Sequence, residues 1–285
     1  MFLFDQEALK SVLESVIQKN TSQEIWNWIN QSSSTNTTSW NTAFASMPRK
    51  TGKKIIELTA DQHNQILSIR KGLRITSWSI DRLCRVYLLL SLNAADKLVY
   101  IQRIENLFPS AEMNELVALY SALPVLAYPE AWKKRCAEGI RSNIGTVLES
   151  IICSNPYPSE SLDEAAWNQL VLKAFFTEKP IERIIRLNER ANQTLADTLS
   201  DYAHERWAAG RPVHPQLWRC VSRFINENIF PDIKRIALSV NTAERKAAAW
   251  SCAESNYPPA KELLGNSKEL KSYVQEGINW NTLSL

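Results

Sequence analysis

Apolar residues recur along most of the chain with the spacing of an amphipathic helix. An early stripe sets five apolar side chains three and four residues apart, and so on a single helix face: Leu9, Val12, Leu13, Val16 and Ile17. Similar stripes follow, and prolines interrupt them where helices end. The pattern predicts helices over residues 4–19, 22–30, 60–71, 78–92, 94–107, 111–123, 130–141, 143–153, 162–176, 181–187, 194–209, 215–224, 230–239, 242–255 and 267–276.

Several helix starts carry the pattern of a capping box, in which Ser or Thr is followed three residues later by Glu or Gln. The pairs are Thr21 with Glu24, Thr59 with Gln62 and Ser161 with Glu164. Two segments lack the helical pattern. Residues 31–42 are rich in Ser, Thr and Asn and are predicted to form a polar loop. Residues 53–58 are predicted to be an extended linker, because no second strand is available to pair with them.

Glycine is scarce, with 7 in 285 residues, and no Asn-Gly or Asp-Gly pair marks a tight hairpin. We therefore expect an all-α fold, in the form of an irregular α-solenoid, or HEAT-like helical-repeat array, of antiparallel helix hairpins. We expect an N-terminal part, residues 1–75, with the first helices and the polar loop, followed by a helical array over residues 76–285.

The charge balance gives no sign of nucleic-acid binding. The net charge is only +3, whereas proteins that bind polyanions concentrate basic residues in a stripe. The longest apolar run, residues 86–90, is far shorter than the roughly 20 residues of a membrane-spanning helix. The five cysteines form no CxxC pair, and the N-terminus lacks a basic leader segment. We therefore expect a cytoplasmic protein with reduced thiols.

Three histidines leave little scope for a metal site. His204 and Glu205 begin like an HExxH zinc motif, but position 208 is Ala, so the second histidine ligand is missing. The chain also has no glycine-rich loop of the kind that cradles phosphate. We therefore expect no metal and no cofactor.

One face of the predicted helix 194–209 is polar. It carries Asp197, Asp201, His204 and Glu205 at spacings of three and four residues, with Arg206 beside them. A carboxylate near a histidine raises the pKa of the ring and fixes its tautomer, so Asp201 would orient His204 for proton transfer or for holding a polar ligand. The alternative is a surface cluster of ion pairs or a hydrogen bond between helices.

The predicted helix 162–176 is apolar around most of its circumference and is expected to be central. It nevertheless carries Asn168, Gln169 and Lys173, which need hydrogen-bond partners if they are buried. Carboxylates of helix 194–209 are the expected partners. These polar residues then either satisfy one another across a packed interface or line a ligand groove.

Two runs in these helices resemble a known family. They are DEAAWNQLVLKA at residues 163–174 and DYAHERWAAGRP at residues 201–212, with NPYP at 155–158 and LWR at 217–219 beside them. Together they resemble the EboA-like family of metabolite-traffic proteins. The likeness is strongest over residues 153–224 and weaker back to residue 78, and residues 1–75 show none.

The resemblance implies a pathway. Genes of the family cluster with a UbiA-type membrane prenyltransferase homologue, and the cluster is linked to moving secondary-metabolite precursors across the cytoplasmic membrane. We expect a non-enzymatic scaffold or carrier that binds a protein of the same pathway, such as that homologue, or a hydrophobic, terpenoid-like metabolite. The expected binding residues are Asn168, Gln169, Lys173, His204, Glu205, Arg206 and Arg211.

Two other interpretations are open. One is an enzyme acting on a prenylated or aromatic metabolite, in which His204 is the general acid and base, Asp201 orients it, and Lys173 or Arg206 holds an anionic group. The other is peripheral attachment to the inner face of the cytoplasmic membrane through helix 4–19, whose polar face is not strongly basic. We favour the carrier because the sequence contains no complete catalytic motif.

Overall fold

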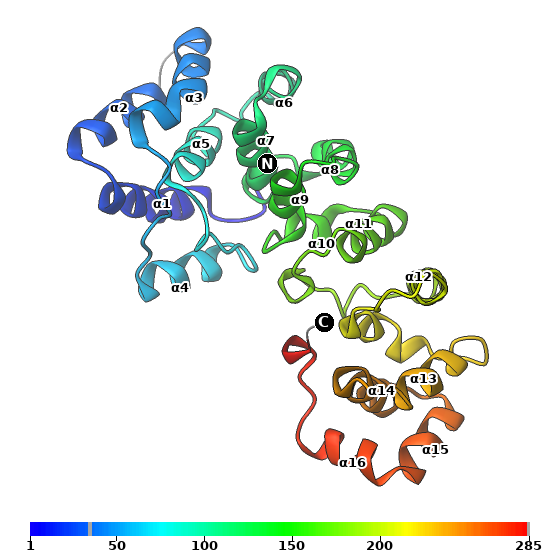
Figure 1. Cartoon of the computed structure of the whole chain (residues 1–285). Helices are drawn as coiled ribbons and strands as arrows, with labels where there is room; N and C mark the ends of the chain where they lie inside the picture. Colours follow the sequence, from blue (N-terminus) through cyan, green and yellow to red (C-terminus); the bar gives the residue numbers. More distant parts are fainter. Residues whose placement is uncertain (34–35, 284–285) are drawn as a thin grey trace. The chain divides into compact units, whose positions relative to one another are not determined.

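The computed structural model describes residues 1–33 and 36–283 of the chain. Over these residues it consists of α- and 3-10 helices joined by short connections, and the only β pairing among them is a single antiparallel bridge between Ile55 and Ser79 (Figure 1). The prediction of an all-α fold is confirmed. The finer prediction of a helical-repeat array stays a prediction. Within the same residues, no helix combines the length and apolar character that a membrane crossing requires.

The chain divides into two compact units, Met1–Trp167 and Asn168–Leu285. The α-helices of the first unit are α1 (Gln6–Asn20), α2 (Gln23–Ser33), α3 (Thr37–Thr51), α4 (Ala60–Ile69), α5 (Ile80–Leu90), α6 (Lys97–Glu105), α7 (Met113–Ala122), α8 (Lys133–Ile140), α9 (Gly145–Ile152) and α10 (Tyr157–Ser161). Its 3-10 turns are η1 (Phe108–Ser110), η2 (Leu123–Val125) and η3 (Pro129–Trp132). Helix α11 (Glu164–Phe176) contains the division between the units.

Helix α5 is the centre of the first unit. All of its residues except Arg82 are buried, and α1, α2, α3 and α7 pack around it. An ion pair lies inside this core, where Arg85 Nη1 donates to Asp81 Oδ2 at 2.8 Å. Arg85 Nε also donates to the backbone carbonyl of Phe44 in α3 at 2.8 Å. These bonds satisfy the buried guanidinium and fix α3 against α5.

The second unit is built on α14 (Thr242–Glu254). Its buried residues form a continuous run from Ala247 to Cys252, and α13, α15, α16 and the 3-10 turns η5 and η6 pack against it. The remaining elements of this unit are α12 (Gln193–Ala208), α13 (Phe230–Ala237), α15 (Pro258–Asn266), α16 (Lys268–Gln275), η4 (Ile181–Arg183), η5 (Pro215–Cys220), η6 (Ser222–Phe224) and η7 (Trp280–Thr282).

The polar loop predicted over residues 31–42 is wrong for most of its length. Helix α2 continues to Ser33, and α3 starts at Thr37, while residues 34–35 lie outside the described residues. Asn36 caps α3, since its Oδ1 accepts from the Ser39 amide at 3.0 Å. An apolar stripe at Trp40, Ala43, Phe44 and Met47 then holds the helix to the core. The Ser and Thr residues in the first half of α3 are exposed, namely Thr37, Thr38, Ser39 and Thr42.

Other boundaries differ in smaller ways. Neither 181–187 nor 215–224 is an α-helix: the first contains only the 3-10 turn Ile181–Arg183, and the second contains the 3-10 turns Pro215–Cys220 and Ser222–Phe224. The prediction also missed the helix over 258–266. The capping box of Thr59 and Gln62 is confirmed. At α11 the sequence predicts a capping box of Ser161 with Glu164. The cap is Asp163, whose Oδ1 accepts from the Ala166 amide at 2.8 Å. Segment 53–58 is extended as predicted, but it does find a partner, because the Ile56 amide donates to the carbonyl of Trp78 at 3.0 Å.

Candidate functional site

Helix α12 carries three of the seven expected binding residues, His204, Glu205 and Arg206. It begins at Asn192, whose Oδ1 accepts from the Leu195 amide at 2.8 Å and so caps the helix. Leu195, Leu199 and Ala203 are buried and hold α12 to the second unit. This packing leaves the face with Asp197, Asp201 and Glu205 toward solvent.

Asn168 of α11 is paired with the start of α12. Its side-chain amide exchanges two hydrogen bonds with the amide of Asn192, at 3.1 and 2.8 Å. Asn168 is buried, so this exchange satisfies the polar group that the sequence analysis expected to need a partner. The partner is an amide, however, and not one of the carboxylates of α12.

His204 is oriented by Asp232 of α13, and the expectation that Asp201 orients it is wrong. His204 Nε2 lies 2.6 Å from Asp232 Oδ1, and the Ser200 hydroxyl donates to Asp232 Oδ2 at 2.6 Å. Asp201 is exposed, whereas Asp232 is buried. A buried carboxylate requires hydrogen-bond donors, and Ser200 and His204 supply them one helical turn apart. The arrangement joins α12 to α13.

Trp207, near the end of α12, makes further contacts with α13 and with η5. Its indole stacks on Trp218 of η5, with ring centroids 5.8 Å apart, and the Arg235 guanidinium lies 4.2 Å from the centroid of its ring. The His204 ring is 5.9 Å from the same indole. These contacts add cation–π and stacking attraction to the hydrogen bonds and fix the direction of the last turns of α12.

A groove of about 460 Å³ lies at the C-terminal end of α12, and we name it the C-terminal groove. Its lining residues come from the end of α11, the last turns of α12 and the turn that follows: Phe176, Glu178, Tyr202, Glu205, Arg206, Ala209 and Arg211. Three of the seven expected binding residues, Glu205, Arg206 and Arg211, therefore meet here. A volume of this size falls in the usual range of small-molecule sites.

The backbone after α12 turns back on itself and brings the two arginines together. Gly210 adopts a left-handed conformation with φ of 66°, which a residue without a Cβ tolerates well. The Arg211 amide then donates to the Arg206 carbonyl at 2.8 Å. Arg206 Nε donates to the carbonyl of Pro212 at 3.0 Å, which fixes the base of its guanidinium.

The C-terminal groove has charges of both signs beside aromatic surface. Arg206 and Arg211 face Glu178 and Glu205 around it. Burial raises the pKa of the Tyr202 phenol, so this hydroxyl stays protonated at neutral pH and can donate a hydrogen bond. Phe176 is 69% exposed and offers an apolar ring.

The lining also shows how α11 and α12 are related. Asn168 in the first half of α11 bonds to Asn192 at the start of α12, while Phe176 at the end of α11 and Tyr202 near the end of α12 line the same groove. The two helices therefore run in the same direction. The 3-10 turn η4 and the irregular chain around it carry the backbone back to the start of α12.

The other expected residues do not converge on the groove. Gln169 is exposed and Lys173 is half-buried, and neither lines the C-terminal groove. His204 points to Asp232 instead of into the groove. Within residues 1–33 and 36–283, no three His, Cys, Asp or Glu side chains gather as metal ligands would.

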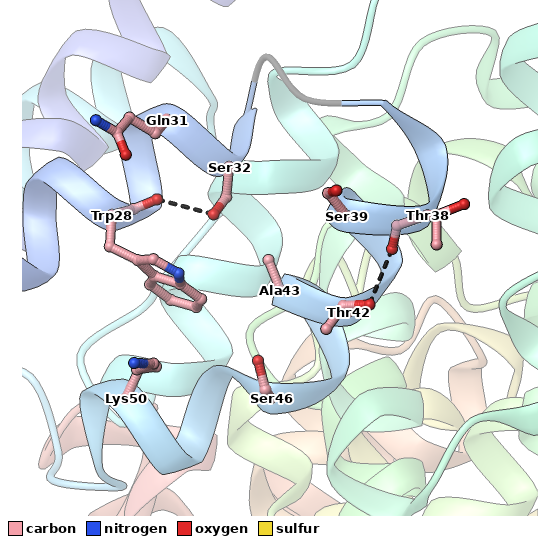
Figure 2. Close-up of a pocket in the computed structure, with 9 residues that line it drawn as sticks. All are labelled: Trp28, Gln31, Ser32, Thr38, Ser39, Thr42, Ala43, Ser46 and Lys50. Atoms are coloured by element: carbon pink, nitrogen blue, oxygen red, sulfur yellow. Dashed lines mark hydrogen bonds between the residues drawn. The ribbon is translucent and has the colours of Figure 1, made fainter.

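A second groove of about 460 Å³ lies in the first unit, between α2 and α3, and sequence analysis missed it (Figure 2). Five of its nine lining residues carry a hydroxyl group, and the lining consists of Trp28, Gln31, Ser32, Thr38, Ser39, Thr42, Ala43, Ser46 and Lys50. Figure 2 shows the Trp28 indole lying between the two helices. The sequence signal for this groove is a polar residue at every fourth position from 38 to 50. The repeat is recognisable only if this segment is taken as a helix, because residues four apart then share one face.

Comparison with models of protein families shows which family the chain belongs to. The family model described as metabolite traffic protein EboA matches residues 9–222, well over half of the chain. The chain belongs to the EboA family. The resemblance noted in the sequence is confirmed, and the match also includes N-terminal helices in which no likeness was detected. Comparisons with curated proteins and with solved structures give no match.

The EboA match includes the whole lining of the C-terminal groove, from Phe176 to Arg211. It ends at residue 222, before α13 begins. Asp232 therefore lies outside the matched segment, although its partners Ser200 and His204 lie within it. All residues of the C-terminal groove therefore lie in the segment that matches the EboA family. The carboxylate that orients His204 does not.

Proposed function

We propose that this EboA-family protein is a non-enzymatic carrier that binds a small secondary-metabolite precursor in the C-terminal groove. The observation that carries the proposal is the meeting of Glu205, Arg206 and Arg211 with aromatic and acidic side chains around a space of about 460 Å³. The family description, metabolite traffic, supports a protein that holds a metabolite. The geometry of the groove supports the chemical class of that metabolite.

The groove suits a molecule with charged groups on an apolar body. Arg206 and Arg211 would bind a carboxylate or phosphate by charge-assisted hydrogen bonds. The exposed Phe176 ring and the Tyr202 ring offer surface for an isoprenoid chain or an aromatic ring. Glu178 and Glu205 would accept from an ammonium or hydroxyl group of the same molecule.

The position of His204 supports binding over proton transfer. Its Nε2 is held at 2.6 Å by a buried carboxylate that also accepts from Ser200. His204 and Lys173, which the enzyme interpretation needs together, do not line the groove. A hydrogen bond that joins α12 to α13 explains His204 without a reaction.

Isothermal titration calorimetry with two probes tests the proposal. Geranyl phosphate supplies an anionic group on an isoprenoid chain, and L-tryptophan supplies a zwitterion on an aromatic ring. We expect at least one probe to bind and Arg211→Gln to weaken it about tenfold, the effect of losing a charge-assisted hydrogen bond. Arg223→Gln, which removes an exposed arginine of the same unit, is the matched control and should leave the affinity unchanged.

The proposal fails if neither probe binds or if Arg211→Gln and Arg206→Gln both bind as the wild type does. Turnover of either probe by the purified protein, abolished in His204→Ala, would replace the carrier by the enzyme interpretation.

We further propose that the carrier delivers its ligand to a membrane partner such as the UbiA-type prenyltransferase homologue. Co-purification of the two proteins from detergent extracts, lost on exchanging the partner for an unrelated membrane protein, tests this step.

A further inference from the structure

Arg103 of α6 is half-buried, and two nitrogen atoms of its guanidinium group lack hydrogen-bond acceptors. Its Nε and Nη2 atoms are buried and have no hydrogen-bond partner within the protein. The guanidinium lies 5.1 Å from the ring centroid of Trp40, so a cation–π contact holds it in place. The neighbouring Glu105 is engaged elsewhere, because its carboxylate accepts from Arg135 Nε at 2.7 Å.

Leaving such donors without an acceptor is unfavourable. A buried donor without a partner carries a desolvation penalty, which is larger when the group is charged. Burial accordingly lowers the pKa of Arg103, although an arginine remains charged at neutral pH. Native proteins keep few unsatisfied groups of this kind, and a bound ion is one explanation for them.

A groove of about 690 Å³ opens beside Arg103. Its lining is one face of α6 with the residues next to it and the first residue of α3: Thr37, Leu98, Val99, Ile101, Gln102, Arg103 and Asn106. Leu98 is 78% exposed and Val99 63% exposed, although both are large apolar residues. We name this space the α6 groove.

Along α6, the exposed apolar residues of the α6 groove precede its polar residues. Leu98 and Val99 lie in the first turn of α6, and Gln102 and Arg103 lie one turn later. Gln102 Nε2 donates to Asn106 Oδ1 at 2.7 Å, which leaves the Nδ2 hydrogens of Asn106 as donors. An amphiphile laid along this face would therefore meet donors at its head and apolar surface at its tail.

We propose that the α6 groove binds an amphiphile with one anionic head group, which accepts from Arg103, and an apolar chain that covers Leu98 and Val99. The anion supplies the acceptor that the two buried guanidinium donors lack. The chain removes two exposed apolar side chains from water. This site belongs to the first unit, and the proposal does not depend on the C-terminal groove.

Calorimetry on the full-length protein with three probes of equal chain length tests the proposal. Octanoate and octyl phosphate carry the anion, and octanol does not. We expect both anions to bind at least about tenfold more tightly than octanol, because a charge-assisted hydrogen bond contributes on that scale. The tighter of the two anions identifies the head group as carboxylate or phosphate.

Two variants locate the site. Arg103→Gln should weaken the anions about tenfold, with a thermal melt to confirm folding. Leu98→Glu changes a side chain that is already exposed and should also weaken them, whereas Leu98→Lys should bind them at least as tightly as the wild type. Arg49→Gln, an exposed position on α3, is the neutral control.

Three results would overturn the proposal. These are absence of binding by both anions, equal binding of octanol, or unchanged affinity in Leu98→Glu. Arg211→Gln separates this proposal from the proposed function, since it should leave binding in the α6 groove unchanged. Loss of binding in Arg211→Gln, with no change in Leu98→Glu, would assign the anions to the C-terminal groove.

Discussion

Asp232 is a single buried carboxylate on which two side chains of α12 depend. It accepts from Ser200 and bonds to His204, and it is 5% exposed. Each donor is matched to one oxygen, so the carboxylate is satisfied only while α12 and α13 stay in register. Removing Asp232 would leave buried donors without an acceptor, and the desolvation penalty of those donors is what makes the carboxylate important for stability.

We expect Asp232→Ala to destabilise the protein by about 1–3 kcal/mol, because the buried Ser200 hydroxyl loses its acceptor. His204→Ala should cost less, since the His204 side chain is 53% exposed. Urea denaturation followed by circular dichroism measures both effects. Asp201→Ala is the matched control, and as an exposed substitution it should change stability by no more than about 0.5 kcal/mol. A larger effect of Asp201→Ala than of Asp232→Ala would contradict the structure.

His214 is the histidine whose protonation the fold opposes. Burial lowers the pKa of its ring, against a smaller opposite effect of Glu182 and Glu178. Its Nδ1 also accepts from the Gln216 amide at 3.2 Å, a bond that a protonated Nδ1 cannot accept. The unfolded chain therefore binds a proton more readily than the folded chain does.

The sign of the pH effect follows from this difference. Because the folded pKa is lowered, stability falls as the pH drops below the ordinary value of 6.5, and it is fully present above that value. His214→Asn keeps an acceptor at the start of η5 but removes the titration. We expect the Tm of the wild type to fall more between pH 7 and pH 5 than the Tm of His214→Asn. Parallel pH profiles of the two proteins would show that His214 does not contribute.

At the level of elements, one glycine sets how closely three helices of the first unit approach. A Cβ built at Gly139 of α8 would lie 2.5 Å from Ile151 Cδ1 of α9 and 2.5 Å from Tyr120 Cε1 of α7. The Ile151 terminus is able to move, but the Tyr120 ring is part of the packed core. Gly265 of α15 is the opposite case, since a Cβ there would meet nothing within 4 Å.

The two glycines should therefore respond to the same substitution with opposite signs. We expect Gly139→Ala to lower the free energy of unfolding by about 1–3 kcal/mol, the usual cost of overpacking a core. Gly265→Ala should raise it by up to about 1 kcal/mol, because alanine restricts the unfolded chain and favours helix. Chemical denaturation of both variants tests the pair. Stabilisation by Gly139→Ala would show that α7, α8 and α9 pack less closely than the structure has them.

At the scale of the whole molecule, each unit has its own central helix and its own buried thiols. α5 is the core helix of the first unit and α14 that of the second. The five cysteines form no disulfide and are buried: Cys84, Cys136, Cys153, Cys220 and Cys252. Burial raises the pKa of most of these thiols, namely Cys84, Cys136, Cys220 and Cys252.

Native protein should therefore resist thiol reagents. The thiolate is the reactive form, and burial both disfavours it and blocks access. We expect Ellman's reagent to label no cysteine in the native state on the timescale that labels free thiols, and all five in urea. Mass spectrometry of the labelled protein checks the count. Rapid labelling of one thiol in the native state would contradict its buried position.

The sequence by itself determined the helical class, most helix positions and the family. These depend on local information: the spacing of apolar residues, capping side chains, prolines and the two motif runs. It also placed Glu205, Arg206 and Arg211 among the binding residues, and the structure brings these three together at one groove. The failure at residues 31–42 has a local cause too, since composition was given more weight than the stripe through Trp40 and Phe44.

Only the tertiary structure decided the partners. His204 bonds to Asp232, which is 28 positions further along the chain, and not to Asp201 on its own helix. Helices α11 and α12 run parallel because the segment between them returns to the start of α12, a path that no periodicity encodes. The unsatisfied donors of Arg103 likewise depend on its burial against Trp40. Periodicity shows which face of a helix is apolar, but the hydrogen-bond partners of its polar groups depend on which helices pack together.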